Sequence, residues 1–290
     1  MTELAQQIAV GIASGGIYSS VALALVMIFR STGHVNFAQG EMAMLATFLC
    51  WALLDAGMSY WLAFVATVAA AFVGGVLIEW VLIRPVRHGK EMALVTVFLG
   101  LLMICNSVAG WTWGYDMKPF PSPFDGLSFL ANPYVSTHDI GAMAVTVVVM
   151  AALFVALRYT LWGLAMRASS ENPVSSWLVG ISVGRMSGIG WGVASAIGAI
   201  AGVMVAPTLF LDPTMMLNVL LYGFAAALLG GITNPWGAVA GGFIIGVLEN
   251  LIGVYVIGTE IRMSVALIVI IAVLVVKPVG LFGARTVVRY

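Results

Sequence analysis

The stretch IAVGIASGGIYSSVALALVMIF at residues 8–29 contains no charged side chain and ends at Arg30. The hydrocarbon core of a bilayer is about 30 Å thick, and a helix of about 20 apolar residues crosses it. Glu3 precedes the stretch where a secretory signal would carry Lys or Arg, and no A-x-A cleavage pattern is present. We therefore predict that residues 8–29 form a transmembrane helix that is kept in the protein.

The composition of the whole chain resembles that of this stretch. Of the 290 residues, 62% are hydrophobic and 8% are charged, whereas an ordinary soluble domain has about 45–50% apolar and about 25% charged residues. No polar block is large enough to fold in water by itself, so we predict a single transmembrane domain over residues 1–290. Twelve Lys and Arg balance twelve Asp and Glu, and this balance gives no sign of a nucleic-acid partner.

Further apolar runs follow along the chain and predict the remaining helices. Residues 213–248 carry no charge, which is too long for one helix, and GGITNPWG at 230–237 divides them. We predict an all-α polytopic membrane protein of about nine transmembrane or partly broken helices. The predicted spans are 8–29, 35–54, 61–83, 92–113, 139–157, 186–209, 217–232, 236–257 and 261–276.

The basic residues predict the orientation of these spans, because Lys and Arg concentrate in cytoplasmic loops. An N-terminus outside and a C-terminus inside leaves only Lys118 and Arg262 outside. The opposite orientation would leave ten basic residues outside and two inside. We therefore expect the N-terminus outside and the C-terminus inside. The basic residues then on the cytoplasmic side are Arg30, Arg84, Arg87, Lys90, Arg158, Arg167, Arg185, Lys277, Arg285 and Arg289.

Signatures of an enzyme are missing from the sequence. There is no phosphate-binding loop, since Glu91 follows the only Gly-Lys pair, so the chain is not expected to hydrolyse ATP. The three histidines lie on separate predicted loops, without H-E-x-x-H spacing. Cys50 and Cys105 lie in apolar runs, where a thiol behaves as a small hydrophobe. We predict no catalytic residue, no metal and no cofactor.

Polar residues at membrane depth mark the segment HVNFAQGEMAM at residues 34–44. Such groups are costly in a bilayer and usually face the bundle interior or a water-filled path. Gly40 suggests irregular backbone there, which needs cover from protein or a cavity. A helix start explains the segment equally well, with Asn36 as the cap, Gln39 completing a capping box and Glu41 near the positive end of the dipole. The two interpretations are compatible.

A second polar segment, RASSENPVSSWLVGISVGR at residues 167–185, lies in the cytoplasmic loop predicted for 158–185. Asn172-Pro173 is a typical helix start, because proline suits the first helical position, and Gly180 would end the helix. The side chains of Trp177, Leu178 and Ile181 would then share an apolar face. That face indicates either a protein partner or contact with the bilayer interface, which also suits Trp177.

Both segments resemble signatures of the branched-chain amino-acid permease family of ABC importers. Residues 36–41 (NFAQGE) are similar to the family's N-F-A-H-G-E, with Gln39 in place of the common His. Residues 171–181 are similar to its E-N-P-x-x-A-x-x-x-G-I coupling loop, with Ser175-Ser176 in place of a common Ala pair. The AALLGGI run within 225–232, PWGAVAGG at 235–242 and KPVGLF at 277–282 also match, so the resemblance covers nearly the whole chain.

The resemblance implies a multi-pass permease in a bacterial inner membrane that carries branched-chain or other hydrophobic amino acids. It implies three kinds of partner: a second permease chain (homologous or identical), two ATP-binding cassette subunits, and a periplasmic substrate-binding protein. Carried over by position, the coupling helix comprises Glu171, Asn172, Pro173, Gly180 and Ile181. Asn36, Gln39 and Glu41 would lie near the translocation path. We add Glu249 and Asn250 to the path because of their membrane depth alone.

Other functions remain open on the sequence. Within the same class, urea, short amides and aromatic acids are alternative substrates. An ion-coupled secondary transporter would need carboxylates near the bilayer midplane, for which Glu41, Glu79 and Glu249 are candidates. It would leave the helix predicted after Asn172 without a role. A purely structural protein is disfavoured by the polar residues at membrane depth.

Overall fold

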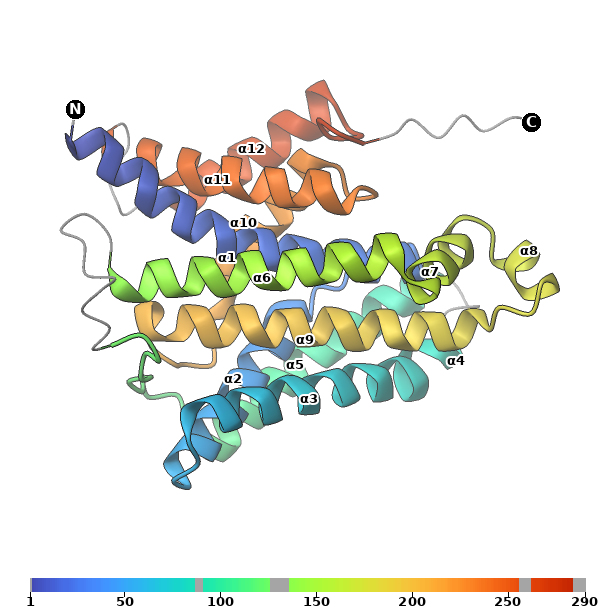
Figure 1. Ribbon diagram of the computed structural model, residues 1–290, viewed down its shortest axis with the longest axis horizontal. Coiled ribbons are helices and arrows are strands. Elements are labelled where there is room, and N and C mark those ends of the chain that lie inside the picture. The colour runs from blue at the N-terminus through green and yellow to red at the C-terminus, as the bar shows by residue number, and fades with distance from the viewer. Residues whose placement is uncertain (1, 87–90, 126–135, 256–261, 284–290) are drawn as a thin grey trace. The chain divides into compact units, whose positions relative to one another are not determined.

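The computed structural model describes the chain except residues 1, 87–90, 126–135, 256–261 and 284–290. The described part contains helices and no named strand. The helices are α1 (Thr2–Thr32), α2 (Gln39–Asp55), α3 (Tyr60–Ile78), the π-helix η1 (Glu79–Ile83), α4 (Arg84–Val86), α5 (Glu91–Trp113), α6 (Thr137–Tyr159), α7 (Leu161–Glu171), α8 (Pro173–Leu178), α9 (Val183–Leu209), α10 (Met216–Gly230), α11 (Pro235–Tyr255) and α12 (Arg262–Val276) (Figure 1).

Each of the nine predicted spans overlaps a helical stretch, the third one α3 together with η1, and the all-α polytopic class is confirmed. Among the described residues, six helical stretches are long and apolar enough to cross a membrane by length and composition, and α10 and α12 are shorter apolar helices. The helix α2, with 17 residues, begins at Gln39 rather than at residue 35. The orientation of the two termini stays a prediction.

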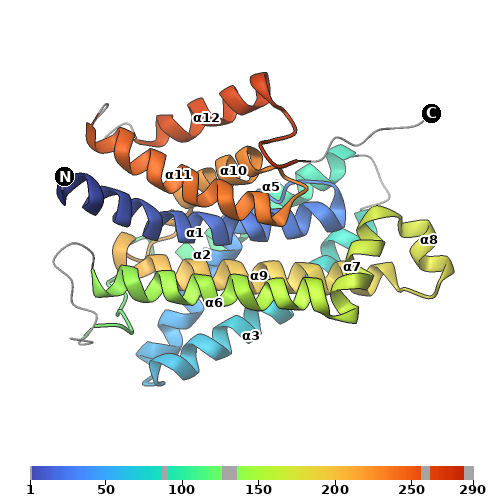
Figure 2. The ribbon, with the colours of Figure 1, turned by 45° about the horizontal axis from the view of Figure 1, so that its top comes forward.

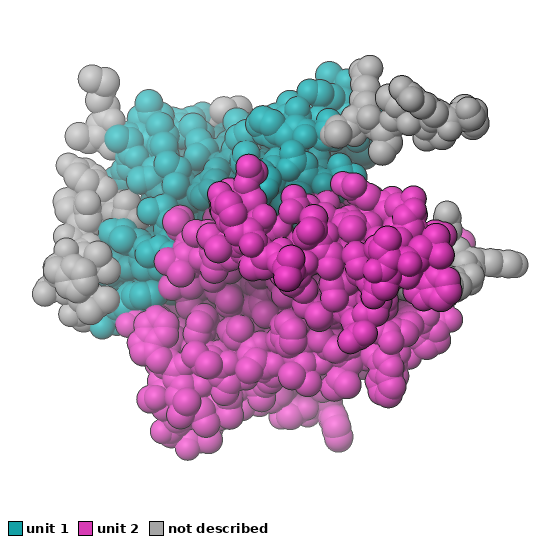
Figure 3. Space-filling view, turned by 45° about the vertical axis from the view of Figure 1, so that its right-hand side comes forward, with its two compact units in different colours: residues 1–26, 124–144, 217–290 teal, residues 27–123, 145–216 magenta. Residues whose placement is uncertain are grey.

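Contacts divide the chain into two compact units, which Figure 3 colours separately. Unit 1 comprises residues 1–26, 124–144 and 217–290, and unit 2 comprises residues 27–123 and 145–216. Both units draw on distant parts of the sequence. The prediction of one domain over residues 1–290 is not tested by this division.

In unit 1, α1 and α11 approach one another closely through glycines. A Cβ placed on Gly15 would lie 2.9 Å from Phe243 Cα, and one on Gly11 would lie 2.8 Å from Val247 Cα. The Ser19 hydroxyl adds a bond by donating to the carbonyl oxygen of Val239 at 2.8 Å. Helices in lipid gain little from the hydrophobic effect and associate through such close van der Waals packing. The small residues of GIASGG therefore position α1 against α11.

In unit 2, α9 is the central helix and packs on α2 and α3 (Figure 1). It buries a run of small residues that includes Gly188, Gly192 and Ser195. A Cβ on Gly192 would lie 2.8 Å from a methyl carbon of Val76 on α3. Figures 1 and 2 show α8 next to α7, beyond the N-terminal end of α9.

Candidate functional site

Glu41 is held inside unit 2 by a polar partner from another helix. Its side chain is 5% exposed, and its Oε2 accepts a hydrogen bond from Asn106 Nδ2 on α5 at 3.3 Å. The same nitrogen donates to the carbonyl oxygen of Pro213, between α9 and α10, at 2.8 Å. Asn106 thus links α2 to the segment after α9. Glu41 therefore faces the bundle interior, one of the two positions expected for a polar residue at membrane depth, and its partner comes from another helix.

Gln39 also crosses between helices. Its amide nitrogen donates to the carbonyl oxygen of Ala194 on α9 at 3.0 Å, and the residue is 1% exposed. A Cβ on Gly198 would overlap this nitrogen, so Gly198 provides the space for the amide. Gln39 Oε1 is buried and has no hydrogen-bond partner among the described residues. An unsatisfied buried acceptor costs about 1–3 kcal/mol, so a hydrogen-bond donor placed next to this oxygen would be favoured.

The predicted capping box at the start of α2 is wrong. Ala38 is the N-cap residue, without a side-chain cap. Asn36 instead closes a local turn, because its Oδ1 accepts from the Ala38 nitrogen at 3.0 Å. Gln39 turns toward α9 rather than back to Asn36. The irregular backbone lies before Gln39, and Gly40, where we expected it, is helical.

An apolar cavity of about 320 Å³ lies within unit 2. Met42 and Cys105 line it, and they are the sequence neighbours of Glu41 and Asn106. The buried hydroxyl of Ser195 also lines it and has no partner among the described residues. The remaining lining residues are Leu45, Ala46, Leu49, Ala70, Ala71, Gly74, Gly75, Ile78 and Trp113.

Glu249 and Asn250 belong to unit 1, whereas Asn36, Gln39 and Glu41 belong to unit 2. Both are buried, with 5% and 4% exposure. Asn250 Nδ2 donates to the backbone oxygen of Gln7 at 2.6 Å and to its Oε1 at 2.9 Å. Asn250 therefore ties α11 to the first turns of α1. The role of all five residues in a translocation path stays a prediction.

The short helix expected after Asn172 is present as α8. Asn172 Oδ1 accepts from the Ser175 nitrogen at 2.9 Å, and Pro173 occupies the first helical turn. Gly180 has φ +86°, a conformation that glycine adopts without a steric penalty. Glu171 is the last residue of α7, so it lies at the C-terminal end of one helix as well as before the next.

The surface of α8 is apolar and exposed to an unusual degree. Val174, Trp177, Leu178 and Val179 are between 70% and 75% exposed. Ile181, which we placed on the same face, is only half-exposed, and its backbone nitrogen donates to the Ser176 oxygen. The apolar face is thus made by Val174, Trp177, Leu178 and Val179, and we call these four residues the α8 face.

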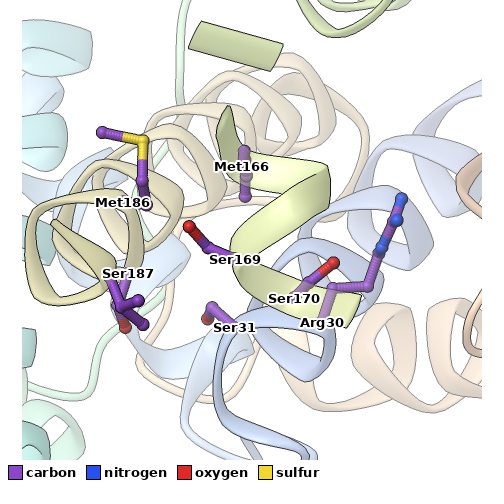
Figure 4. A pocket seen from close by; sticks show the side chains of 8 residues that line it. Arg30, Ser31, Met166, Ser169, Ser170, Met186 and Ser187 are labelled. Atoms are coloured by element: carbon purple, nitrogen blue, oxygen red, sulfur yellow. The ribbon is translucent and has the colours of Figure 1, made fainter. Parts of the chain in front are cut away.

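A small cavity of about 20 Å³ lies at the base of this loop, between α1, α7 and α9 (Figure 4). The hydroxyls of Ser169 and Ser187 line it, are buried, and lack partners among the described residues. A cavity of this size accommodates about one water molecule. It therefore fits a structural water and is too small for a transported solute. Arg30, Ser31, Met166, Ser170, Val183 and Met186 complete the lining.

Sequence reasoning missed two partners, Asn106 and Arg84. Asn106 lies within the predicted span 92–113, so the criterion of a polar residue at membrane depth, which selected Asn250, could also have found it. Arg84 forms an ion pair with Glu79, with Nη2 and Oε2 2.8 Å apart. The two residues are five apart, which is not a spacing that brings side chains together in an α-helix. No group of three or more potential metal ligands occurs in the searched, described residues.

Comparisons with known proteins place this chain in a family. A family model described as the permease component of branched-chain amino acid transport systems matches residues 7–274. The chain is 30% identical to LivH of Salmonella typhimurium, a high-affinity branched-chain amino acid transport system permease protein, over 96% of this chain and 95% of LivH. It is 28% identical to a probable LivH of Methanocaldococcus jannaschii, over 92% of this chain and 90% of that protein.

A solved structure supports the fold. PsaBC from Streptococcus pneumoniae in complex with Fab superposes with a TM-score of 0.51 and 12% identity, covering 93% of this chain and 91% of that chain. At this identity the likeness concerns the fold alone. The sequence relatives carry the assignment, and the chain belongs to the family of permease components of branched-chain amino acid transport systems.

Proposed function

We propose that this chain is the permease subunit of an ATP-driven importer that carries branched-chain or other hydrophobic amino acids across a bacterial inner membrane. The observation that carries the proposal is the match, over nearly the full length of both chains, to relatives named high-affinity branched-chain amino acid transport system permease proteins. The buried polar residues of α2 support it, because polar groups at membrane depth usually line a path.

The proposed complex contains a second permease chain, two ATP-binding cassette subunits and a periplasmic substrate-binding protein. The α8 face is the proposed contact for an ATP-binding subunit. Four large apolar side chains at a water-facing loop are unfavourable unless a partner or the bilayer interface covers them. α8 lies between the spans α6 and α9, so a push on it acts on both helices. Glu171, Asn172, Pro173, Gly180 and Ile181 form the proposed coupling segment.

The proposed path uses Asn36, Gln39 and Glu41 in unit 2, and Glu249 and Asn250 in unit 1. The buried carboxylate of Glu41 suits the ammonium group of an amino acid, and the unpaired Gln39 Oε1 accepts a hydrogen bond. The neighbouring apolar cavity suits an aliphatic side chain. A ligand with one cationic group and one apolar group fits this combination.

Uptake by the reconstituted complex tests the function. Proteoliposomes with the permease chains and ATP-binding subunits receive labelled leucine bound to the periplasmic protein. We expect uptake that requires internal ATP and stops with a non-hydrolysable analogue. Uptake driven by a proton or sodium gradient without ATP would indicate the secondary-transporter alternative. Parallel trials with urea, a short amide and an aromatic acid would separate substrates within the class.

The orientation has its own test. With the N-terminus outside and the C-terminus inside, a membrane-impermeant thiol reagent should label a cysteine introduced at Thr2 in intact cells. A cysteine introduced at Arg285 should react only after the membrane is opened. The reverse labelling pattern would contradict the proposed topology.

A further inference from the structure

Arg84 joins two helices at the loop end of unit 2. The π-helix η1 follows α3 and contains Glu79, whose side chain is fully buried. A π-helix brings residues i and i+5 together, and Arg84 lies five residues after Glu79. Its Nη2 is 2.8 Å from Glu79 Oε2. π-bulges occur frequently at functional sites, so the ion pair between Glu79 and Arg84 is a candidate for a functional role.

The same nitrogen reaches the helix that follows α8. Arg84 Nη2 donates to the carbonyl oxygen of Gly184, in the first turn of α9, at 2.8 Å. Only residues 179–182 separate α8 from α9. Arg84 therefore fixes the start of α9 to the end of the α3 segment. We call Glu79, Arg84 and Gly184 the Arg84 cluster.

Two glycines of α9 leave space for this cluster. A Cβ on Gly184 would lie 3.4 Å from Arg84 Cζ, and one on Gly188 would lie 3.4 Å from Glu79 Oε2. These distances are ordinary van der Waals contacts, so a Cβ at either position would touch the ion pair without overlapping it. The sequence VGRMSGIG at the start of α9 thus places two glycines directly against the Arg84 cluster.

The geometry of Arg84 differs from what neutralising the buried Glu79 carboxylate alone would require. For that purpose, arginine and a carboxylate pair most strongly through two parallel hydrogen bonds. Here Glu79 Oε1 and Arg84 Nε are both buried and lack partners among the described residues. The guanidinium makes one bond to Glu79 and directs the same nitrogen to Gly184. The second bond to Glu79 is absent, and the bond to α9 is present.

We propose that Arg84 is a positioning residue that locks the first turn of α9 to α3, so that a displacement of α8 moves α3 together with α9. The inference rests on the proposed function, because it assigns Arg84 a part in coupling ATP hydrolysis to transport. Without the bond to Gly184, the first turn of α9 would move with α8 while the end of the α3 segment around Arg84 stays behind, even though the rest of α9 remains packed on α3. ATP would then be hydrolysed with little substrate moved.

The test compares two variants in the reconstituted complex. Glu79→Gln removes one charge and keeps Arg84 with its bond to Gly184, so we expect coupling close to that of the parent. The double variant Glu79→Gln/Arg84→Met leaves no buried unpaired charge but removes the donor to Gly184. We expect it to assemble with the ATP-binding subunits and hydrolyse ATP, while the amount of substrate moved per ATP falls about five-fold or more, the lower end of typical coupling between sites.

Lys277→Gln is the matched control. It also removes one basic side chain that donates to a backbone oxygen, since Lys277 Nζ donates to the Leu281 oxygen at 3.0 Å. It should transport like the parent. The proposal is overturned if the double variant moves as much substrate per ATP as Glu79→Gln. It is also overturned if only the double variant fails to accumulate, since that result indicates a purely structural role. Absence of ATP-driven uptake in the parent would instead overturn the proposed function, and this inference with it.

Discussion

Helix backbones meet at glycines in both units, but the two units differ in the polar links between their helices. In unit 1, glycines bring the backbones of α1 and α11 into contact, and Ser19 and Asn250 add bonds to backbone oxygens. In unit 2, side chains of Gln39, Glu41 and Arg84 reach across to other helices. Backbone contact tolerates almost no change, whereas side-chain links can be removed or re-formed. The two kinds of contact should therefore respond differently to substitution: a change at a backbone contact should lower stability, whereas a change at one side-chain link should alter function first.

The largest effect is expected from breaking the backbone contact in unit 1. In Gly15→Val, the new Cβ would lie within 3.0 Å of Phe243 Cα and the Gly242 oxygen, neither of which can yield without moving the backbone. Overpacking of this kind costs about 1–3 kcal/mol or more. We expect membrane abundance and thermal stability in detergent to fall sharply. Gly100→Val is the control, because no atom lies within 4 Å of a Cβ there. Equal stability of both variants would show that the close contact between α1 and α11 is not needed for stability.

A smaller loss, confined to function, is expected from Gly180→Leu next to α8. A left-handed conformation costs an ordinary residue about 1–2 kcal/mol, so the chain after α8 should shift and displace the α8 face. Uptake and transport-coupled ATP hydrolysis should fall together, with abundance near normal. Gly57→Leu imposes the same strain, since Gly57 also has φ +86° and open space around it. Normal transport by Gly180→Leu, with the ATP-binding subunit bound, would show that α8 does not couple.

A change confined to one side-chain link in unit 2 is Glu41→Gln. The amide oxygen of glutamine can still accept from Asn106, so the link between α2 and α5 should survive. The charge proposed to attract the substrate is lost. Hydrogen bonds to charged groups contribute about 1.5–3 kcal/mol, so we expect uptake to fall about ten-fold through a higher KM, at normal abundance. Asn106→Ala breaks the link instead and should lower stability. Unchanged uptake kinetics in Glu41→Gln would remove Glu41 from the path.

The smallest effect is expected from Glu171→Lys. A carboxylate next to a helix N-terminus contributes about 0.3–1 kcal/mol, but Glu171 also ends α7, where a carboxylate is unfavourable. The two effects oppose one another, and the side chain is exposed. We expect uptake within about two-fold of the parent by the same dipole magnitudes. A much larger loss, at normal abundance, would indicate that Glu171 contacts the ATP-binding subunit directly.

The features that the sequence predicted well are those set by neighbouring residues. The apolar runs predicted the long helices because a span needs a long apolar stretch, and six of the described helical stretches meet that length and composition. Asn172, Pro173 and Gly180 predicted the bounds of α8 because capping and left-handed turns depend on a few adjacent residues. Membrane depth alone also identified Glu41, Glu249 and Asn250 as buried.

The features that the sequence did not predict depend on distant partners or on helix geometry. Asn106 pairs with Glu41 from another helix, and nothing in its own apolar surroundings indicates this. Gln39 suited a capping box by spacing, but the carbonyl of Ala194 on α9 is its actual acceptor. The sequence placed Arg84 in a loop because it is basic. Its pairing with Glu79 could not be predicted, since it depends on the i to i+5 spacing of a π-helix.

The exposed α8 face also has a consequence for a subunit made in excess. Before assembly, Val174, Trp177, Leu178 and Val179 present a contiguous apolar surface to water. Chaperones and proteases continuously remove unfolded protein, and a stability change of about 1–2 kcal/mol alters protein abundance several-fold. If an ATP-binding subunit covers the α8 face, as we propose, an unassembled chain would carry a signal for removal that the bound partner conceals. The same four side chains would both transmit force in the complete machine and keep the number of its subunits in balance.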